Sequence, residues 1–209
     1  MSDPDTGRGL SAHRSEALTD GIYAVAMTLL VIELKLPDHG PFTGGDALAQ
    51  AVANLLPKVI AWVISFFVLG LFWYGHHRAF AQVRRVDGKL VALNIGQLAF
   101  VSLMPFSCAL AGEYGRQELS QVIYSINMAG LAVMALFTSR YIQRHPDPAL
   151  MSMPLPAYRG ARIRLLGLVV ISIVAVGINH IVPRAGNAAF MLMALVMPLS
   201  RRVERAALA

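Results

Sequence analysis

The sequence is poor in the charged residues with which a water-soluble protein covers its surface. Only 14% of its 209 residues are charged, and no polar stretch is long enough to form a separate globular domain. This excludes an enzyme whose catalytic site lies in such a domain. The single cysteine, Cys108, excludes an intramolecular disulfide, so the cysteine content does not indicate a compartment.

Apolar side chains dominate instead. They make up 56% of the chain, and the mean hydropathy is +0.56, which predicts an integral membrane protein. A helix needs roughly 20 apolar residues to cross a bilayer, so the chain has room for at most about seven crossings. The net charge of +6 comes from short basic clusters between apolar segments, so it indicates topology, and we expect no nucleic-acid partner.

Six apolar segments can be placed along the chain as transmembrane helices, which predicts an all-α membrane protein. They lie at about 16–36, 56–77, 90–111, 121–142, 163–181 and 187–199. The expected organisation is an N-terminal tail, a transmembrane domain and a C-terminal tail, with bounds 1–13, 14–202 and 203–209. The last segment is short, and Pro198 near its end would bend or end it.

The basic residues predict the orientation of these helices, because Lys and Arg accumulate on the cytoplasmic side. With the N-terminus inside, six helices leave fourteen of the eighteen basic residues in the cytoplasm. The four on the other side are Lys35, Lys58, Arg116 and Arg184. Five or seven crossings would move the basic cluster at 201–205 outside. We therefore expect six crossings with both termini in the cytoplasm.

The first segment has two faces with different chemistry. At 100° per residue, Val25, Leu29 and Ile32 lie on one apolar stripe, and Thr28 lies within about 60° of its centre. Asp20 falls about 140° away from Val25. The stripe suits contact with lipid or with other helices. It also suits a pore, because stacked apolar rings around a symmetry axis can gate ion flow by dewetting.

Polar residues at the start of this segment need partners if they point into the bundle. Trp73 and His77 are spaced i, i+4 near the cytoplasmic end of the second segment, so Asp20 could accept a hydrogen bond from either. A proton relay through Asp20 and His77 is an alternative. A metal site is a further one, although the adjacent histidines 76–77 point about 100° apart, which is poor ligand spacing. Five other polar residues are expected to form hydrogen bonds between helices: Asn94, Gln97, Tyr124, Asn127 and Asn179.

The run from Arg14 to Asp20, followed by an apolar helix, resembles the R-x-x-x-F-S-D signature that opens the first helix of the transmembrane protein 175 family, in its bacterial single-repeat branch. Later parts of the chain also look like that family, namely Trp73 with 76–78, Asn94, and Pro105-Phe106 followed by 112–114. Leu18 departs from the signature's aromatic residue and Thr19 from its serine, so the hydroxyl is kept and the ring is lost.

The resemblance implies a homotetrameric, potassium-permeable cation channel with six helices per subunit, whose first helix lines a central pore. By position, Val25, Leu29 and Ile32 match the apolar constriction of that family, and Thr28 matches a pore-lining threonine linked to potassium preference. The residues that match the network bracing the pore helix are Arg14, Thr19, Asp20, Trp73 and His77. The implied location is the cell membrane of a bacterium, with lipids and monovalent cations as partners.

The sequence therefore predicts a leak-like, weakly selective potassium channel. It contains no T-V-G-Y-G filter, so rings of backbone carbonyls would not strip the ion of water. We expect no cofactor and no bound metal beyond K⁺ in transit. The alternative is a proton-coupled transporter that uses Asp20 and His77. A membrane-embedded enzyme would need a nucleophile with its base, or a metal set, and neither is evident. A noncatalytic membrane scaffold is the remaining functional hypothesis.

Overall fold

The computed structural model describes residues 10–36, 45–81, 83–147, 149, 151–183 and 185–206. Within these ranges the chain is a bundle of helices with one very short pair of strands. Residues 1–9 of the expected N-terminal tail and 207–209 of the expected C-terminal tail lie outside the described residues, as do 37–44 and the basic residues Arg8 and Arg184. The first four residues of the expected C-terminal tail belong to α8.

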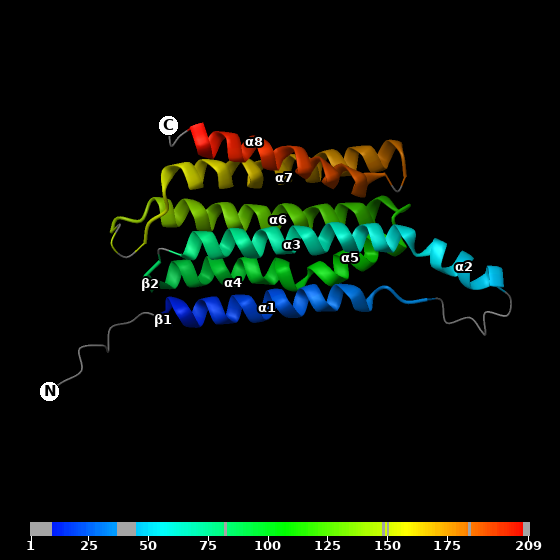
Figure 1. Cartoon of the computed structure of the whole chain (residues 1–209), viewed down its shortest axis with the longest axis horizontal. Helices are drawn as coiled ribbons and strands as arrows, with labels where there is room; N and C mark the ends of the chain where they lie inside the picture. The colour runs from blue at the N-terminus through cyan, green and yellow to red at the C-terminus, as the bar shows by residue number, and fades with distance from the viewer. Residues whose placement is uncertain are drawn as a thin grey trace.

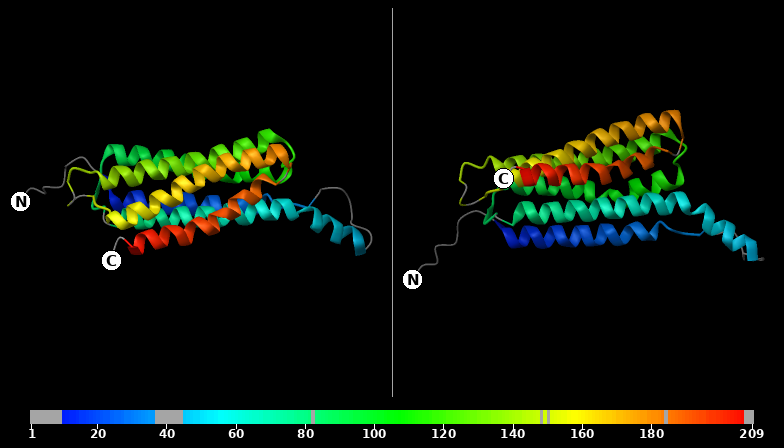
Figure 2. Two further views of the ribbon diagram at one scale, coloured as in Figure 1. Left: turned by 90° about the horizontal axis from the view of Figure 1, so that it is seen from above. Right: turned by 45° about the horizontal axis from the view of Figure 1, so that its top comes forward.

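The helices run back and forth along one axis (Figures 1 and 2). Their bounds are α1 Ala12–Ile32, α2 Gly45–Asn54, α3 Leu56–Phe80, α4 Gly88–Ser102, α5 Met104–Glu113, α6 Glu118–Gln143, α7 Leu155–Ile181, the 3₁₀ helix η1 Gly186–Leu192, and α8 Met193–Ala206. Strand β1 (Leu10–Ser11) pairs antiparallel with β2 (Arg85–Val86). In Figure 1, α1 lies on one side of the bundle and α7 with α8 on the other.

Five stretches of the described chain are long and apolar enough to cross a membrane. They are His13–Ile32, Leu56–Phe80, Gly88–Glu113, Glu118–Gln143 and Leu155–Ile181. The third contains both α4 and α5, which meet at Leu103. The sequence predicted one uninterrupted helix over 90–111. The helix is broken there because Pro105, in the first turn of α5, has no N–H to donate to the preceding turn.

The sixth expected segment, 187–199, consists of η1 followed by α8. This stretch returns along α7 toward the end of the bundle where β1 lies (Figure 1). Pro198 does not end α8, which continues to Ala206. At 14 residues α8 is shorter than a typical membrane span, so the sixth crossing stays a prediction.

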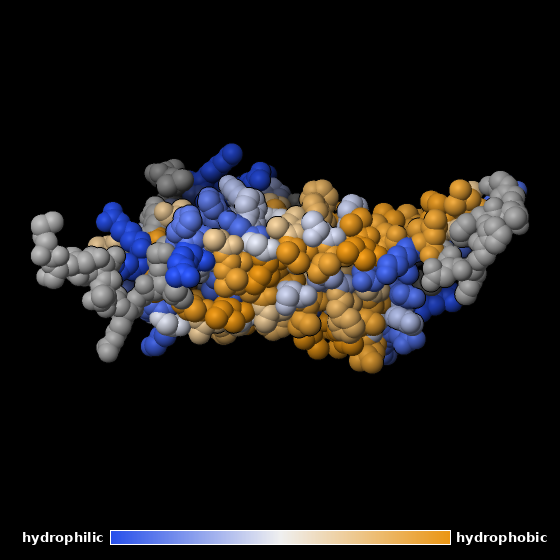
Figure 3. All heavy atoms as spheres, turned by 90° about the horizontal axis from the view of Figure 1, so that it is seen from below, coloured by the Kyte–Doolittle hydropathy of each residue, from blue (hydrophilic) through white to orange (hydrophobic). Residues whose placement is uncertain are grey.

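The apolar surface is gathered over the middle of the bundle, and hydrophilic residues lie mainly toward its two ends (Figure 3). The end that carries β1, β2 and the last turn of α8 also carries most of the described basic residues. Asp87, the N-cap of α4, lies at this end. Burial raises its pKa, but hydrogen bonds from the Tyr141 hydroxyl and the Leu90 N–H outweigh burial and hold the pKa below its usual value.

Polar side chains join the helices inside the bundle. The Tyr124 hydroxyl of α6 lies 2.9 Å from the Ser65 hydroxyl of α3, and Asn127 donates to Ser107 of α5 at 3.0 Å. The Gln97 amide of α4 donates to the Tyr23 hydroxyl of α1 at 3.0 Å. The prediction that Gln97, Tyr124 and Asn127 bond between helices is confirmed.

The turn between α7 and η1 depends on a close approach at Gly186. A Cβ on this residue would lie 2.7 Å from the backbone carbonyl oxygen of Ala175 and equally close to the Gln121 side chain. The carbonyl belongs to α7 and cannot move without bending that helix. Gly186 therefore lets η1 pack tightly against α7 and α6, which sets the path of α8.

We expect Gly186→Ala to lower the free energy of unfolding by about 1–3 kcal/mol, because the added methyl group overpacks the turn. Thermal unfolding of the purified protein in detergent measures this change. Gly177→Ala is the matched control, because a Cβ at this exposed position of α7 meets nothing within 4 Å. The control should melt at or slightly above the wild-type temperature, since alanine favours a helix. Equal melting temperatures for the two variants would contradict the proposed close packing.

Candidate functional site

Helix α1 presents one face to its own bundle and leaves the other uncovered. The face turned toward α3, α4 and α5 carries the buried side chains Ser15, Thr19, Tyr23, Ala26 and Leu30. On the other face Val25, Leu29 and Ile32 are 57%, 41% and 50% exposed. The three residues of the predicted stripe therefore form an apolar surface that no described part of the same chain covers.

Thr28 lies on this uncovered face beside Val25 and Leu29. Its hydroxyl donates to the Val25 carbonyl of the previous turn at 2.8 Å. This bond fixes the side chain against the helix and leaves the hydroxyl oxygen free to accept from water or to approach a cation.

Trp73 joins α1 to α3 at the edge of the uncovered face. Its indole N–H donates to the Asp20 carboxylate at 2.8 Å, and both residues are exposed in the single chain. His77 stacks on the Trp73 ring, with centroids 6.3 Å apart, and is also exposed. No direct hydrogen bond links Asp20 to His77 in the described structure. The two members of the suggested proton relay are thus separated by the indole.

A buried polar network lies behind this edge, and Asn94 of α4 is its centre. The Asn94 amide nitrogen donates to Thr19 at 3.0 Å and to the Ser15 hydroxyl at 3.1 Å. Its amide oxygen lies 3.0 Å from Nε2 of His76. Thr19, Asn94 and His76 are 0%, 2% and 7% exposed. The network therefore ties α1, α3 and α4 together in the interior, where each unpaired polar group would be costly.

The structure thus places His76, and not its neighbour His77, in the buried network. His76 also stacks on Phe80, with ring centroids 4.0 Å apart. The sequence analysis did not place His76 among the bracing residues. The signal was available, because His76 is spaced i, i+4 from both Phe72 and Phe80, which lie on the buried face of α3.

Two residues of the predicted bracing network, Arg14 and His77, form no hydrogen bond or ion pair with the described residues, and His77 only stacks on Trp73. Arg14 is exposed near the start of α1, and no described side chain pairs with its guanidinium. No group of three His, Cys, Asp or Glu side chains suited to a metal ion occurs in the described ranges. The histidines 76–77 and Asp20 do not gather as ligands, since His76 is bonded to Asn94.

The helices and the α1 site define an all-helical membrane protein, with an uncovered apolar helix face braced from behind by buried hydrogen bonds. A family model described as endosomal/lysosomal potassium channel TMEM175 matches residues 14–105, the stretch that contains every residue of the site. A potassium channel of Streptomyces collinus is 34% identical over 155 residues, covering 72% of this chain and 74% of that protein. The chain belongs to the TMEM175 family, which is a family of ion channels and not of enzymes.

Two further comparisons support membership of the TMEM175 family. The crystal structure of a lysosomal potassium-selective channel TMEM175 homologue from Chamaesiphon minutus is 26% identical and superimposes with a TM-score of 0.71, covering 90% of this chain and 97% of that one. The human endosomal/lysosomal proton channel TMEM175 is 29% identical over 221 residues, which cover 94% of this chain and 44% of the human protein. The family therefore contains proteins named for different ions.

We expect Asn94→Ala to destabilise the folded subunit by about 1–3 kcal/mol, because it leaves the buried Thr19 and His76 groups without their partner. Thermal unfolding of the purified protein in detergent measures this change. Ile95→Ala is the matched control, since Ile95 is the next residue of α4 and is exposed. If both variants melt alike, the network does not hold α1 in place.

Proposed function

We propose that four copies of this chain assemble into a potassium-permeable, weakly selective and leak-like cation channel, with α1 of each copy lining a central pore. The observation that carries this proposal is the uncovered face of α1. Asp20 lies exposed within a membrane span, and a carboxylate in contact with lipid costs about 2.5–3.5 kcal/mol. The edge of the uncovered face that carries Asp20 is therefore better placed against water or another subunit than against lipid.

The apolar stripe would form the constriction of this pore. The stripe residues lie on successive turns of one helix. In a symmetric assembly Val25, Leu29 and Ile32 would therefore make three stacked rings over about 10 Å. Narrow apolar rings can stop ion flow by losing their water. Thr28 would add a ring of hydroxyl oxygens between them, which is the polar group best placed to favour one cation over another.

The backbone of α1 argues for weak selectivity. The helix is continuous from Ala12 to Ile32, so the carbonyls beside the stripe are engaged in helix hydrogen bonds. They cannot replace the water around a potassium ion as the carbonyl rings of a dedicated filter do. A cation would instead pass with part of its hydration, which favours only a modest preference for potassium over sodium.

The topology proposed for this channel has six crossings, with residues 14–202 in the membrane and both tails in the cytoplasm. From Gly186 to Ser200, just before the basic cluster, η1 and α8 are about 26 Å long, which is close to the thickness of the hydrocarbon core. The basic residues lie mainly at the end of the bundle where α8 ends (Figure 1), as expected for the cytoplasmic side of a cell membrane. No cofactor is required for passive conduction.

Replacing each stripe residue by alanine should raise potassium flux severalfold, because a wider and less apolar ring is easier to wet. The measurement is flux from liposomes carrying a potassium gradient, with valinomycin as the reference for full release. Ile173→Ala is the matched control, since Ile173 is an exposed apolar residue of α7, away from α1. Unchanged flux in Val25→Ala, Leu29→Ala and Ile32→Ala would remove the constriction from the proposal even if the protein conducts.

Proton-coupled transport through Asp20 and His77 is the second candidate function. It is favoured by the exposure of both groups and by the mammalian relatives that are named proton channels. The hydrogen bond from Trp73 argues instead that Asp20 braces α1.

Asp20→Asn and Trp73→Phe separate these two roles. If Asp20 braces the helix, Trp73→Phe loses this hydrogen bond and Asp20→Asn keeps only a weaker one to an uncharged oxygen. Both variants should then weaken the oligomer, by about 1–3 kcal/mol for Trp73→Phe and less for Asp20→Asn, and leave the potassium preference nearly unchanged. Subunit dissociation in detergent and reversal potentials in planar bilayers measure the two effects. Loss of pH-dependent flux in Asp20→Asn alone, with an intact oligomer, would instead support the proton role.

A further inference from the structure

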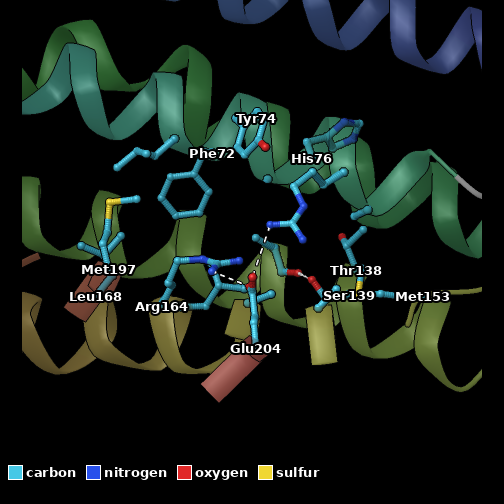
Figure 4. Close-up of a pocket in the computed structure, with 18 of the residues that line it drawn as sticks. Phe72, Tyr74, His76, Thr138, Ser139, Met153, Arg164, Leu168, Met197 and Glu204 are labelled. Carbon is cyan, nitrogen blue, oxygen red and sulfur yellow. Dashed lines mark hydrogen bonds and ion pairs between the residues drawn. The ribbon is translucent and has the colours of Figure 1, made fainter. Parts of the chain in front are cut away.

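A second cavity lies on the side of the bundle away from α1. It has a volume of about 470 Å³ and is lined by residues of α3, α4, α6, α7 and α8, together with Met153 (Figure 4). In Figure 1, α7 and α8 lie opposite α1, so a pore along α1 would leave this side of each subunit toward the lipid. None of the residues of the α1 stripe lines the cavity.

Charge is concentrated at one end of this cavity. Four arginines line it, namely Arg78, Arg164, Arg201 and Arg205. Glu204 is the only carboxylate among the described lining residues. Arg164 lies 2.8 Å from the Glu204 carboxylate and Arg78 lies 3.7 Å from it. Glu204 therefore compensates part of the positive charge, and the cavity keeps a net positive lining.

Much of the remaining lining is apolar and lies farther from the basic end. Five polar side chains also line the cavity, namely Tyr74, His76, Gln97, Thr138 and Ser139. On α8, Met193 lies eight residues from Arg201, or about 12 Å along the helix. On α3, Phe72 lies six residues from Arg78. The two helices run toward the same end of the bundle, so arginines surround the mouth of the cavity and apolar side chains line its interior.

Glu204 is held in this cavity by a close approach of α8 to α7. A Cβ on Gly160 of α7 would overlap the Glu204 carboxylate, so any larger residue at this position would displace that side chain. The carboxylate also stands beside the Ser200 hydroxyl, to which Arg164 donates at 3.1 Å. Arg201 and Arg205 are exposed and form no ion pair with the described residues, which leaves two guanidinium groups to meet an anion.

We propose that this cavity binds one anionic phospholipid from the leaflet at the basic end of the bundle. The phosphate contacts the arginines at the mouth, and an acyl chain enters the apolar interior. Basic pockets between transmembrane helices recognise acidic headgroups in this way, and guanidinium groups suit phosphate oxygens. A free phosphate would use the mouth alone and leave the apolar interior empty. The site does not depend on ion conduction and is tested without it.

The test is native mass spectrometry of the full chain purified in detergent, with phosphatidylglycerol or phosphatidylcholine of identical acyl chains. We expect the wild type to prefer phosphatidylglycerol and the double variant Arg201→Gln, Arg205→Gln to lose affinity for it by about 30-fold. Lys35→Gln with Arg116→Gln is the matched control. It removes two exposed positive charges at the opposite end and should bind as the wild type does.

Two more variants distinguish loss of the lipid site from misfolding of the protein. Glu204→Gln removes the competing carboxylate and should strengthen phosphatidylglycerol binding, which a misfolded protein would not do. Ala135→Trp fills the interior and should weaken binding of both lipids. Unchanged phosphatidylglycerol binding in the arginine double variant overturns the site. Full displacement of the lipid by glycerol phosphate also overturns it, because the arginines would then belong to a free anion. A changed subunit number in Ala135→Trp overturns it as well, because the cavity would then belong to a second copy of the chain.

Discussion

The hydrogen bonds of Asn94 are the interaction on which the arrangement of this protein depends. One amide side chain joins Ser15 and Thr19 of α1 to His76 of α3, in an interior where unpaired polar groups are costly. Because hydrophobic burial contributes little between helices inside a bilayer, such bonds and close packing decide how the helices rotate. The rotation of α1 in turn decides which of its residues stay uncovered.

The two sides of the bundle are suited to different surroundings. On one side α1 exposes an apolar stripe together with Thr28 and Asp20, a mixture that suits a water-filled pore or a subunit contact better than lipid. On the other side α7 and α8 enclose a cavity with four arginines toward the basic end of the bundle and mainly apolar side chains farther from it. A subunit that meets its copies through α1 would meet lipid through α8.

Much of the site could be predicted from the sequence because helical spacing is regular. The angular separation of Val25 from Asp20 follows from their numbers alone, and a hydrogen bond to Asp20 from Trp73 or His77 follows from polar residues at matching depth. The spacing of His76 from Phe72 and Phe80 indicates which of the two adjacent histidines shares the buried face of α3. That His76 meets Asn94 depends on how α3 is rotated against α4, which spacing along one helix does not decide.

By itself the sequence determined that this is an all-helical membrane protein of the TMEM175 family, since composition, periodicity and the opening motif of α1 are local properties of the chain. Only the tertiary structure decided that Asn94 and His76 form the interior network, that Pro105 divides one predicted helix into α4 and α5, and that four arginines converge on one cavity. These features join residues from different helices. Their meeting is decided by packing across the whole bundle, which no local pattern encodes.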